Sequence, residues 1–243
     1  MGTVLISAEA TEAVSEIVVN AIELDIASVT VNGIAASFTL HEESERLIIS
    51  ADVAQGPCDI AIAFTGILND KLRGFYRSTF TDDSGVVRTI ATTQMQSTDC
   101  RRAFPCFDEP DFKAVFAIDL TIKSEFLAVS NSSETKREVL ANGLTRIWFA
   151  DTMIMSTYLV AFVVGPLEAT ETEMVGDIAV RIIHVPGKSH LTEFGMRAGT
   201  FALDWFQTYY GVPYPSDKVD LLALPDFAAG AMENVGCITF REV

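Results

Sequence analysis

The stretch Phe116-Ala117-Ile118-Asp119-Leu120-Thr121-Ile122 places a large apolar residue at every second position. This is the period of a β-strand that buries one face and exposes the other. Ile22-Glu23-Leu24-Asp25-Ile26 repeats the alternation, and most apolar residues from Ile17 to about Ile183 follow it. Half-buried antiparallel strands at such spacings are typical of a multi-stranded sandwich or saddle. The sequence therefore predicts a mainly β fold, with further strands at residues 60–64, 159–164 and 178–183.

Two tight turns are predicted between neighbouring strands. Asn32-Gly33 follows the apolar run Val29-Thr30-Val31, and Asn142-Gly143 precedes Ile147-Trp148-Phe149. An Asn-Gly pair favours the backbone conformation of a short hairpin, because both residues tolerate positive φ angles. We expect a hairpin at each place.

The periodicity changes after Pro186-Gly187, which predicts a second structural unit. Apolar residues then fall three or four apart, as in an amphipathic helix; they are Phe194, Ala198, Phe201, Ala202, Trp205 and Tyr209. Ser189 is the expected cap at the helix start and Gly211 the expected stop. Strands are predicted at 219–224 and 237–240. One helix and two short strands cannot close a core, so we expect a complete β domain at 1–187 and the incomplete start of another domain at 188–243.

The composition excludes several classes of protein. Among 243 residues the formal net charge is −16, which disfavours binding to nucleic acid or to an anionic membrane surface. No apolar run approaches the roughly 20 residues of a membrane-spanning helix. The four cysteines are scattered rather than closely paired, which favours a reducing compartment and predicts a cytoplasmic protein with free thiols.

The most informative segment for function is Asp226-Phe227-Ala228-Ala229-Gly230-Ala231-Met232-Glu233-Asn234. Its small residues surround one carboxylate and would let another main chain approach closely. Glu233 could then meet a bound cation. The alternative is an ordinary acidic loop between two strands.

Gly230-Ala231-Met232-Glu233-Asn234 is identical to the exopeptidase motif of the zinc aminopeptidases related to aminopeptidase N. Other blocks resemble the same family in the same order, most closely its puromycin-sensitive aminopeptidase branch; they lie at residues 66–78, 99–110, 155–165 and 212–215. The resemblance spans nearly the whole chain. It implies a β saddle in front of a thermolysin-like catalytic domain, with the substrate held where the two meet.

The resemblance also implies a substrate-binding role for the whole motif, Gly230, Ala231, Met232, Glu233 and Asn234. In the family the glutamate binds the free α-amine of a peptide, and the backbone near the glycine pairs with the substrate main chain. The amine, with a pKa near 8, is largely protonated at neutral pH. A fixed carboxylate therefore favours the binding of a peptide N-terminus. An internal peptide segment would leave that carboxylate without its charge partner.

Two positions depart from the family pattern. Gln94-Met95-Gln96 corresponds to a Gln-x-Glu sequence that contributes to the amine pocket, so Gln94 and Gln96 are candidate ligands of the amine, but Gln96 adds no negative charge. The alternative is that both glutamines bond only to backbone. Val235 stands where the family usually has tryptophan, and the vacated volume could loosen the loop.

These departures keep other functions open. A non-catalytic binding or scaffold paralogue on the same fold is the main alternative to an aminopeptidase. Because the leukotriene hydrolase branch carries two glutamines at the Gln-x-Glu position, hydrolysis of a lipid epoxide is a third reading.

The family's zinc is held by a His-Glu-x-x-His helix and a further glutamate, and neither occurs in this sequence. The similar string His41-Glu42-Glu43-Ser44-Glu45 lacks the second histidine and lies in the β region, so we expect a solvated strand end there. We therefore expect no metal ligand and no catalytic residue in these 243 residues, which should be inert alone. Zinc, the remainder of the catalytic domain and peptides with a free N-terminus are the partners implied for the full-length protein.

Overall fold

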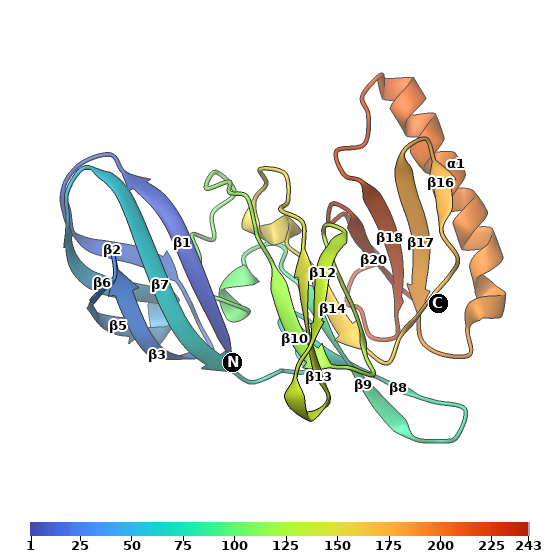
Figure 1. Ribbon diagram of the computed structural model, residues 1–243, viewed down its shortest axis with the longest axis horizontal. Coiled ribbons are helices and arrows are strands. Elements are labelled where there is room, and N and C mark those ends of the chain that lie inside the picture. Colours follow the sequence, from blue (N-terminus) through green and yellow to red (C-terminus); the bar gives the residue numbers. More distant parts are fainter. Residues whose placement is uncertain (243) are drawn as a thin grey trace.

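The computed structural model describes residues 1–242. The described residues form five sheets, with one long helix near the C-terminal end (Figure 1). The first two sheets are antiparallel and face each other across a shared apolar core. One is ordered β1 (Gly2–Ala10), β7 (Gly56–Gly66), β3 (Leu24–Val31) and β4 (Ile34–Ala35); the other is ordered β2 (Val14–Asn20), β6 (Arg46–Val53) and β5 (Ser37–His41). Their core includes Val19, Leu47, Ile49, Ile60 and Ile62.

The next two sheets form the middle of the molecule. One is ordered β10 (Asp119–Lys123), β13 (Leu144–Phe149) and β12 (Glu134–Val139). The other, called the middle sheet from here on, is ordered β11 (Leu127–Ser130), β14 (Phe162–Gly165), β9 (Val87–Gln94) and β8 (Gly74–Thr81). Ile122 and Ile147 of the first meet Ala128 of the second in a small core. The strand predicted at 159–164 is shorter than expected, because Leu159 ends a 3₁₀ turn that begins at Thr157.

The fifth sheet contains the last part of the chain. Its order is β15 (Glu168–Ala169), β17 (Ile178–His184), β18 (Lys218–Leu224), β20 (Cys237–Arg241) and β19 (Ala231–Met232), and β16 (Glu173–Val175) also pairs with β17. β17 is antiparallel to β15 and β16 but parallel to β18, which corrects the purely antiparallel pairing expected before Ile183. β18 and β20 are parallel as well. The strands predicted at 219–224 and 237–240 are confirmed.

Both predicted hairpins are present. Asn32 and Gly33 have φ angles of 51° and 79°, and the flanking Val31 and Ile34 pair directly. Asn142 and Gly143 likewise have positive φ angles and connect β12 to β13.

The predicted helix is α1 (Thr192–Tyr210), and Gly211 ends it in the left-handed conformation, as expected. Ser189 does not cap it. Ser189 begins a short 3₁₀ turn, and Leu191 precedes α1 without a side-chain cap. The correction has a simple cause, since the 3₁₀ turn leads directly into the helix and displaces its cap position by two residues, from Ser189 to Leu191.

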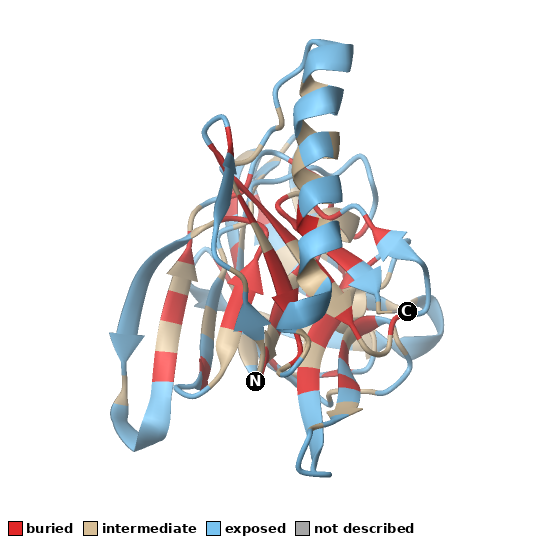
Figure 2. Cartoon of the chain, turned by 90° about the vertical axis from the view of Figure 1, so that its right-hand side faces the viewer, coloured by how far each residue is buried: buried red, intermediate tan, exposed pale blue. Residues whose placement is uncertain are grey.

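The helix packs on the sheet with its small residues and turns its aromatic residues away. A Cβ atom at Gly199 would lie 2.6 Å from Leu221 Cδ1, so glycine permits the close approach of helix and sheet. Met196 is buried on this face. The opposite face is exposed over most of its length (Figure 2); Phe194, Phe201 and Tyr209 expose 74%, 69% and 66% of their surface.

None of the helices in the described part of the chain is long and apolar enough to span a membrane.

Candidate functional site: an exposed carboxylate at a sheet edge

The glycine-rich loop leaves the end of β18 and returns as β19. Burial alternates along it: Met232 and Asn234 are buried, whereas Ala231 and Glu233 are exposed. Met232 enters the core between the middle sheet and the fifth sheet, where it joins Leu224 and Phe227. The Glu233 carboxylate is thus held at the surface between two buried anchors, and no hydrogen bond or ion pair within residues 1–242 occupies it.

β19 lies at the edge of the fifth sheet. Ala231 and Met232 pair on one side with Phe240 and Thr239 of β20, and the Arg241 amide donates to the Gly230 carbonyl. The other side of β19 has no strand beside it in the part of the chain that the structure describes. An edge strand presents unpaired N–H and C=O groups, so it can pair with an added extended peptide.

The space around Gly230 is open. Gly230 is exposed, and a Cβ atom at this position would have no neighbour within 4 Å. Its φ angle is not positive, so the chain itself does not need glycine there. The absence of a side chain leaves open space beside β19, and the approach of another main chain there stays a prediction.

Asp226 fixes the start of the loop to the middle sheet. Its carboxylate Oδ2 accepts hydrogen bonds from the Thr79 amide at 2.9 Å and the Ser78 hydroxyl at 3.3 Å. Its carbonyl oxygen accepts from the Tyr76 hydroxyl at 2.9 Å. Burial first, and the Asp226 charge second, raise the pKa of Tyr76, which keeps this phenol a donor at neutral pH.

The same β8–β9 hairpin carries the two candidate glutamines. Gln94 ends β9 opposite Gly74, two positions along from the pair formed by Thr92 and Tyr76. Its Oε1 atom is buried and has no hydrogen-bond partner. Gln96 is exposed beyond the strand. No hydrogen bond joins either glutamine to Glu233 among the described residues, so the role of these residues stays a prediction.

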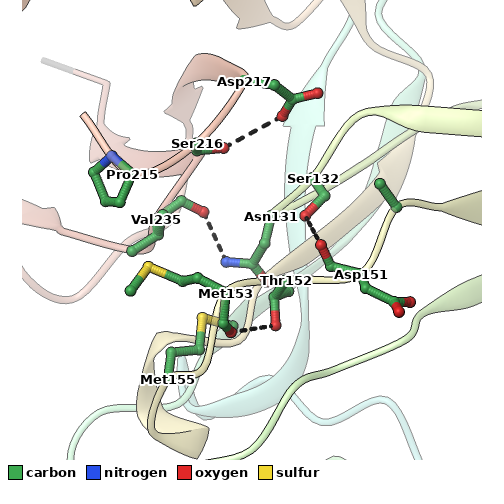
Figure 3. A pocket seen from close by; sticks show the side chains of 11 residues that line it. Asn131, Ser132, Asp151, Thr152, Met153, Met155, Pro215, Ser216, Asp217 and Val235 are labelled. Atoms are coloured by element: carbon green, nitrogen blue, oxygen red, sulfur yellow. Dashed lines mark hydrogen bonds between the residues drawn. The ribbon is translucent and has the colours of Figure 1, made fainter. Parts of the chain in front are cut away.

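The end of the loop is also fixed. The Asn131 side chain donates to the Val235 carbonyl at 2.9 Å, and the Gly236 amide donates to the Tyr214 hydroxyl at 2.8 Å. A cavity of about 220 Å³ lies beside Val235, lined partly by Met153 and Met155 (Figure 3). The small side chain therefore leaves space, as expected, but hydrogen bonds to the main chain hold the loop on either side of that space.

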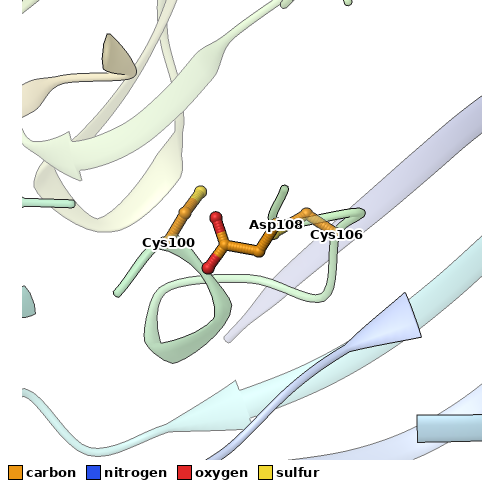
Figure 4. A group of neighbouring side chains, drawn as sticks. All are labelled: Cys100, Cys106 and Asp108. Carbon is orange, nitrogen blue, oxygen red and sulfur yellow. The ribbon is translucent and has the colours of Figure 1, made fainter. Parts of the chain in front are cut away.

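A second cluster of side chains of metal-ligand type lies within the block at residues 99–110. Cys100, Cys106 and Asp108 are buried, and their ligand-type atoms lie within 4.8 Å of one another (Figure 4). Asp108 is already engaged: its Oδ2 accepts from Arg101 Nε at 2.9 Å and its Oδ1 from the Thr157 hydroxyl. A cation here would meet the Arg101 guanidinium, so the arrangement suits a structural ion pair better than a metal.

The cysteines are free thiols, as predicted, and all four are buried. Burial is the main reason why the pKa of Cys100 is raised well above its ordinary value, and it raises the pKa of Cys237 to about 12. Neutral buried thiols are poor nucleophiles and poor metal ligands. The charged block around Arg101 and Arg102 also forms ion pairs, with Glu45 shared between the two guanidinium groups.

The histidines do not make a zinc site. His41 ends β5 in solvent and His190 is exposed, whereas His184 is buried with Nδ1 2.8 Å from the Val185 carbonyl oxygen. They lie on separate elements, and none of them joins the cluster that could hold a metal. These residues do not fit the catalytic zinc that the family resemblance implies, so no step through the metal is derived from them.

Sequence reasoning missed the residues that hold the loop, namely Tyr76, Ser78, Asp226, Asn131 and Lys218. One signal was available: Lys218 and Asp220 are two charged residues inside an otherwise apolar strand, and such charges are buried only when paired. The partners of Asp226 lie 147 to 150 residues away in the chain, and no local pattern reveals them.

Comparison with known proteins agrees with this arrangement. Residues 1–159 match the Peptidase M1 N-terminal domain, and residues 194–243 match the Peptidase family M1 domain. Aminopeptidase M1-A of Oryza sativa subsp. japonica is 40% identical over 99% of this chain, and Aminopeptidase 2 of Candida albicans is 38% identical over all of it. Puromycin-sensitive aminopeptidase of Caenorhabditis elegans is 41% identical over 74%.

The fold and these matches identify the class to which the chain belongs, the N-terminal part of family M1 peptidases. The chain belongs to peptidase family M1, which confirms the family predicted from residues 230–234. Aminopeptidases of this family are zinc metallopeptidases. The chain spans 28%, 26% and 19% of the length of the rice, Candida and nematode proteins.

Proposed function

We propose that this chain is the N-terminal part of a zinc metallo-aminopeptidase that removes single residues from peptide N-termini. The observation that carries the proposal is the exposed, unpaired Glu233 carboxylate, which stands between buried Met232 and Asn234 at a free sheet edge. Such a carboxylate is ready to accept a charged amine without breaking an existing contact.

The chain's own residues would recognise the end of the peptide. Glu233 would pair with the protonated α-amine, and the main chain of β19 would hydrogen-bond to the extended substrate beside Gly230. Gln94 would complete the amine site, since its buried Oε1 lacks a donor that an ammonium could supply. Gln96, exposed nearby in the sequence, would add a neutral acceptor.

Zinc, when bound in the full-length protein, would polarise the scissile carbonyl and activate a water molecule. Its ligands would come from the remainder of the catalytic domain. The aromatic face of α1 would suit such a remainder, because contiguous exposed apolar side chains mark interaction surfaces; Phe194, Phe201, Trp205 and Tyr209 are exposed on this face. Residues 1–243 would then contribute amine recognition and be inert alone.

The domain division and the location belong to the same proposal. A boundary at residues 187 and 188 falls between the two family matches, which end at 159 and begin at 194. Residues 168–184 pair with one another and with β18, so this boundary would cross a sheet to which both units contribute strands. The four unpaired thiols support a cytoplasmic location.

The test is the Glu233→Gln variant of the full-length protein, assayed with an aminoacyl 4-nitroanilide. The substitution keeps the shape and removes the charge, so we expect kcat/KM to fall by about 100-fold or more. Glu138→Gln, an exposed glutamate on β12, is the matched control. Unchanged turnover in Glu233→Gln would exclude the amine-binding role, and an inactive wild-type protein would exclude the aminopeptidase.

A further inference from the structure

Lys218 at the start of β18 is almost fully buried, with 4% of its surface exposed. Its Nζ atom donates to the Ser130 carbonyl at 2.7 Å, the Gly236 carbonyl at 2.6 Å and Asp220 Oδ2 at 2.8 Å. An ammonium has three donors, and here all three have acceptors. The group is therefore fixed in direction as well as in position.

The acceptors come from three different segments. Ser130 ends β11 in the middle sheet, Asp220 lies on β18, and Gly236 closes the loop that carries Glu233. The ammonium thus connects the middle sheet, the fifth sheet and the end of the Glu233 loop at one point. The Gly236 carbonyl also accepts from the Asp220 amide at 3.0 Å, but among residues 1–242 no other side chain donates to it.

Among the described residues, Lys218 shares its only carboxylate partner with a second cation. Asp220, which is fully buried, binds Lys218 and also receives two hydrogen bonds from Arg181, at 2.8 and 2.9 Å. Buried ion pairs contribute little net stability, because the desolvation cost offsets the attraction. What such a pair does supply is a defined geometry for the groups that it joins.

Neighbouring contacts lead from this point to the exposed carboxylate. The Asn131 side chain, next to Ser130, holds the Val235 carbonyl, and the Cys237 amide donates to the Asn234 carbonyl at 3.0 Å. Asn234 itself is buried. Only one exposed residue, Glu233, separates this fixed end from buried Met232, so the placement of its carboxylate depends on where Gly236 is held.

We propose that Lys218 is a positioning residue for Glu233: its buried ammonium holds the end of the Glu233 loop against the middle sheet. The inference rests on the proposed function for its consequence in catalysis, but the positioning itself concerns this chain alone. It predicts that loss of the ammonium loosens residues 231–236 selectively and weakens amine recognition.

The first experiment measures hydrogen exchange in Lys218→Met, which keeps the aliphatic stem and removes the charge. We expect the amides of residues 231–236 to exchange about tenfold faster than in the wild type, with little change in β7. Val219→Ala, on the same strand but in the core shared with Met196 of α1, is the control for general destabilisation. Equal loop exchange in the two variants at matched stability would overturn the proposal.

A second measurement needs no variant. In the wild-type protein labelled with ¹⁵N-lysine, the Lys218 ammonium protons should exchange with water far more slowly than those of exposed Lys136. Rapid exchange of both would show that the ammonium is not held, and would overturn the proposal even if Lys218→Met fails to fold.

The consequence for catalysis is measured in the full-length protein. Lys218→Met should raise KM for an aminoacyl 4-nitroanilide by about tenfold while kcat changes less, because the substitution acts through Glu233 and not on the reacting atoms. Lys136→Met should change neither constant. If the wild type has no such activity the proposed function fails, whereas the exchange measurements still decide whether Lys218 positions the loop.

Discussion

The Tyr76 hydroxyl donates a 2.9 Å hydrogen bond to the carbonyl oxygen of Asp226, although the two residues stand 150 positions apart in the sequence. Tyr76 is fully buried in the middle sheet, and Asp226 opens the loop that carries Glu233. The bond therefore links the rigid sheet that presents Gln94 to the loop that presents the carboxylate. Together with the Lys218 cluster at the other end, it fixes the loop at both ends.

The first prediction concerns this attachment. Asp226→Ala should lower the free energy of unfolding by about 1–3 kcal/mol, because the Thr79 amide and the Ser78 hydroxyl lose their acceptor. Urea denaturation of the wild type and the variant measures the difference. Asp83→Ala, at an exposed turn, should change stability by less than about 0.5 kcal/mol. Equal effects of the two substitutions would contradict the role given to Asp226.

The second prediction follows from the orphaned atom of Gln94. Gln94→Met has a similar shape and removes the buried, unpaired Oε1, so the ligand-free protein should become more stable by about 1 kcal/mol. In the full-length protein the same change should raise KM, because the amine loses an acceptor. Gln207→Met is the control and should lower the stability, since Gln207 Oε1 accepts a hydrogen bond from the Tyr214 amide. A loss of stability in Gln94→Met would contradict the finding that Gln94 Oε1 is buried without a hydrogen-bond partner.

The third prediction separates folding from substrate binding at Gly230. A valine here meets nothing within the chain, so Gly230→Val should change stability by about 0.5 kcal/mol or less. The new side chain would occupy the space beside β19, and kcat/KM of the full-length protein should fall at least about tenfold. Thermal unfolding and peptide turnover, measured on the same preparations, check both parts. Full activity would mean that substrate does not approach this edge.

The fourth prediction is a pH dependence. The hydrogen bond from Lys71 lowers the pKa of Glu23 below its ordinary value of 4.5, against the opposing effect of burial, and the Arg102 charge adds to the lowering. A lowered pKa in the folded state means that the carboxylate stabilises the fold above about pH 4.5 and loses this effect as the pH falls through the folded pKa. The stability difference between the wild type and Glu23→Gln should therefore shrink from about pH 6 to about pH 3.5.

Urea denaturation across that range measures the effect. Glu16→Gln, at an exposed glutamate on β2, should show no comparable trend. A difference between the wild type and Glu23→Gln that grows on acidification would contradict the assigned sign.

The fifth prediction concerns the aromatic face of α1. Trp205 exposes 44% of its surface and stacks on Tyr209, with ring centroids 4.6 Å apart. In a Trp148→Phe background, the emission of Trp205 is taken as the spectrum that Trp205→Phe removes. It should be that of a water-exposed indole in residues 1–243 and should lie at shorter wavelength in the full-length protein. Identical spectra would mean that no further part of the protein covers this face.

The local features of the fold could be predicted from the sequence because each depends on neighbouring residues. Alternating apolar positions predicted strands such as 178–183, Asn32-Gly33 predicted a hairpin, and Gly211 predicted the end of α1. These features need only the periodicity of one element or the φ preference of one residue. The start of α1 was predicted wrongly, because the 3₁₀ turn at Ser189 competes with a side-chain cap and nothing local decides between them.

The identity of the loop was also determined by the sequence, since residues 230–234 carry the family motif by themselves. What only the tertiary structure decided is how that motif is held and which of its groups stay free. Asp226 forms hydrogen bonds with Tyr76 and Ser78, and Lys218 forms them with Ser130 and Gly236. These residues are too far apart in the sequence for any periodic pattern to reveal the contacts. Burial then fixes the outcome: polar groups taken from water must find partners wherever the fold brings them. Glu233 remains exposed because successive side chains of an extended segment point to opposite faces, and Met232 and Asn234 take the buried face.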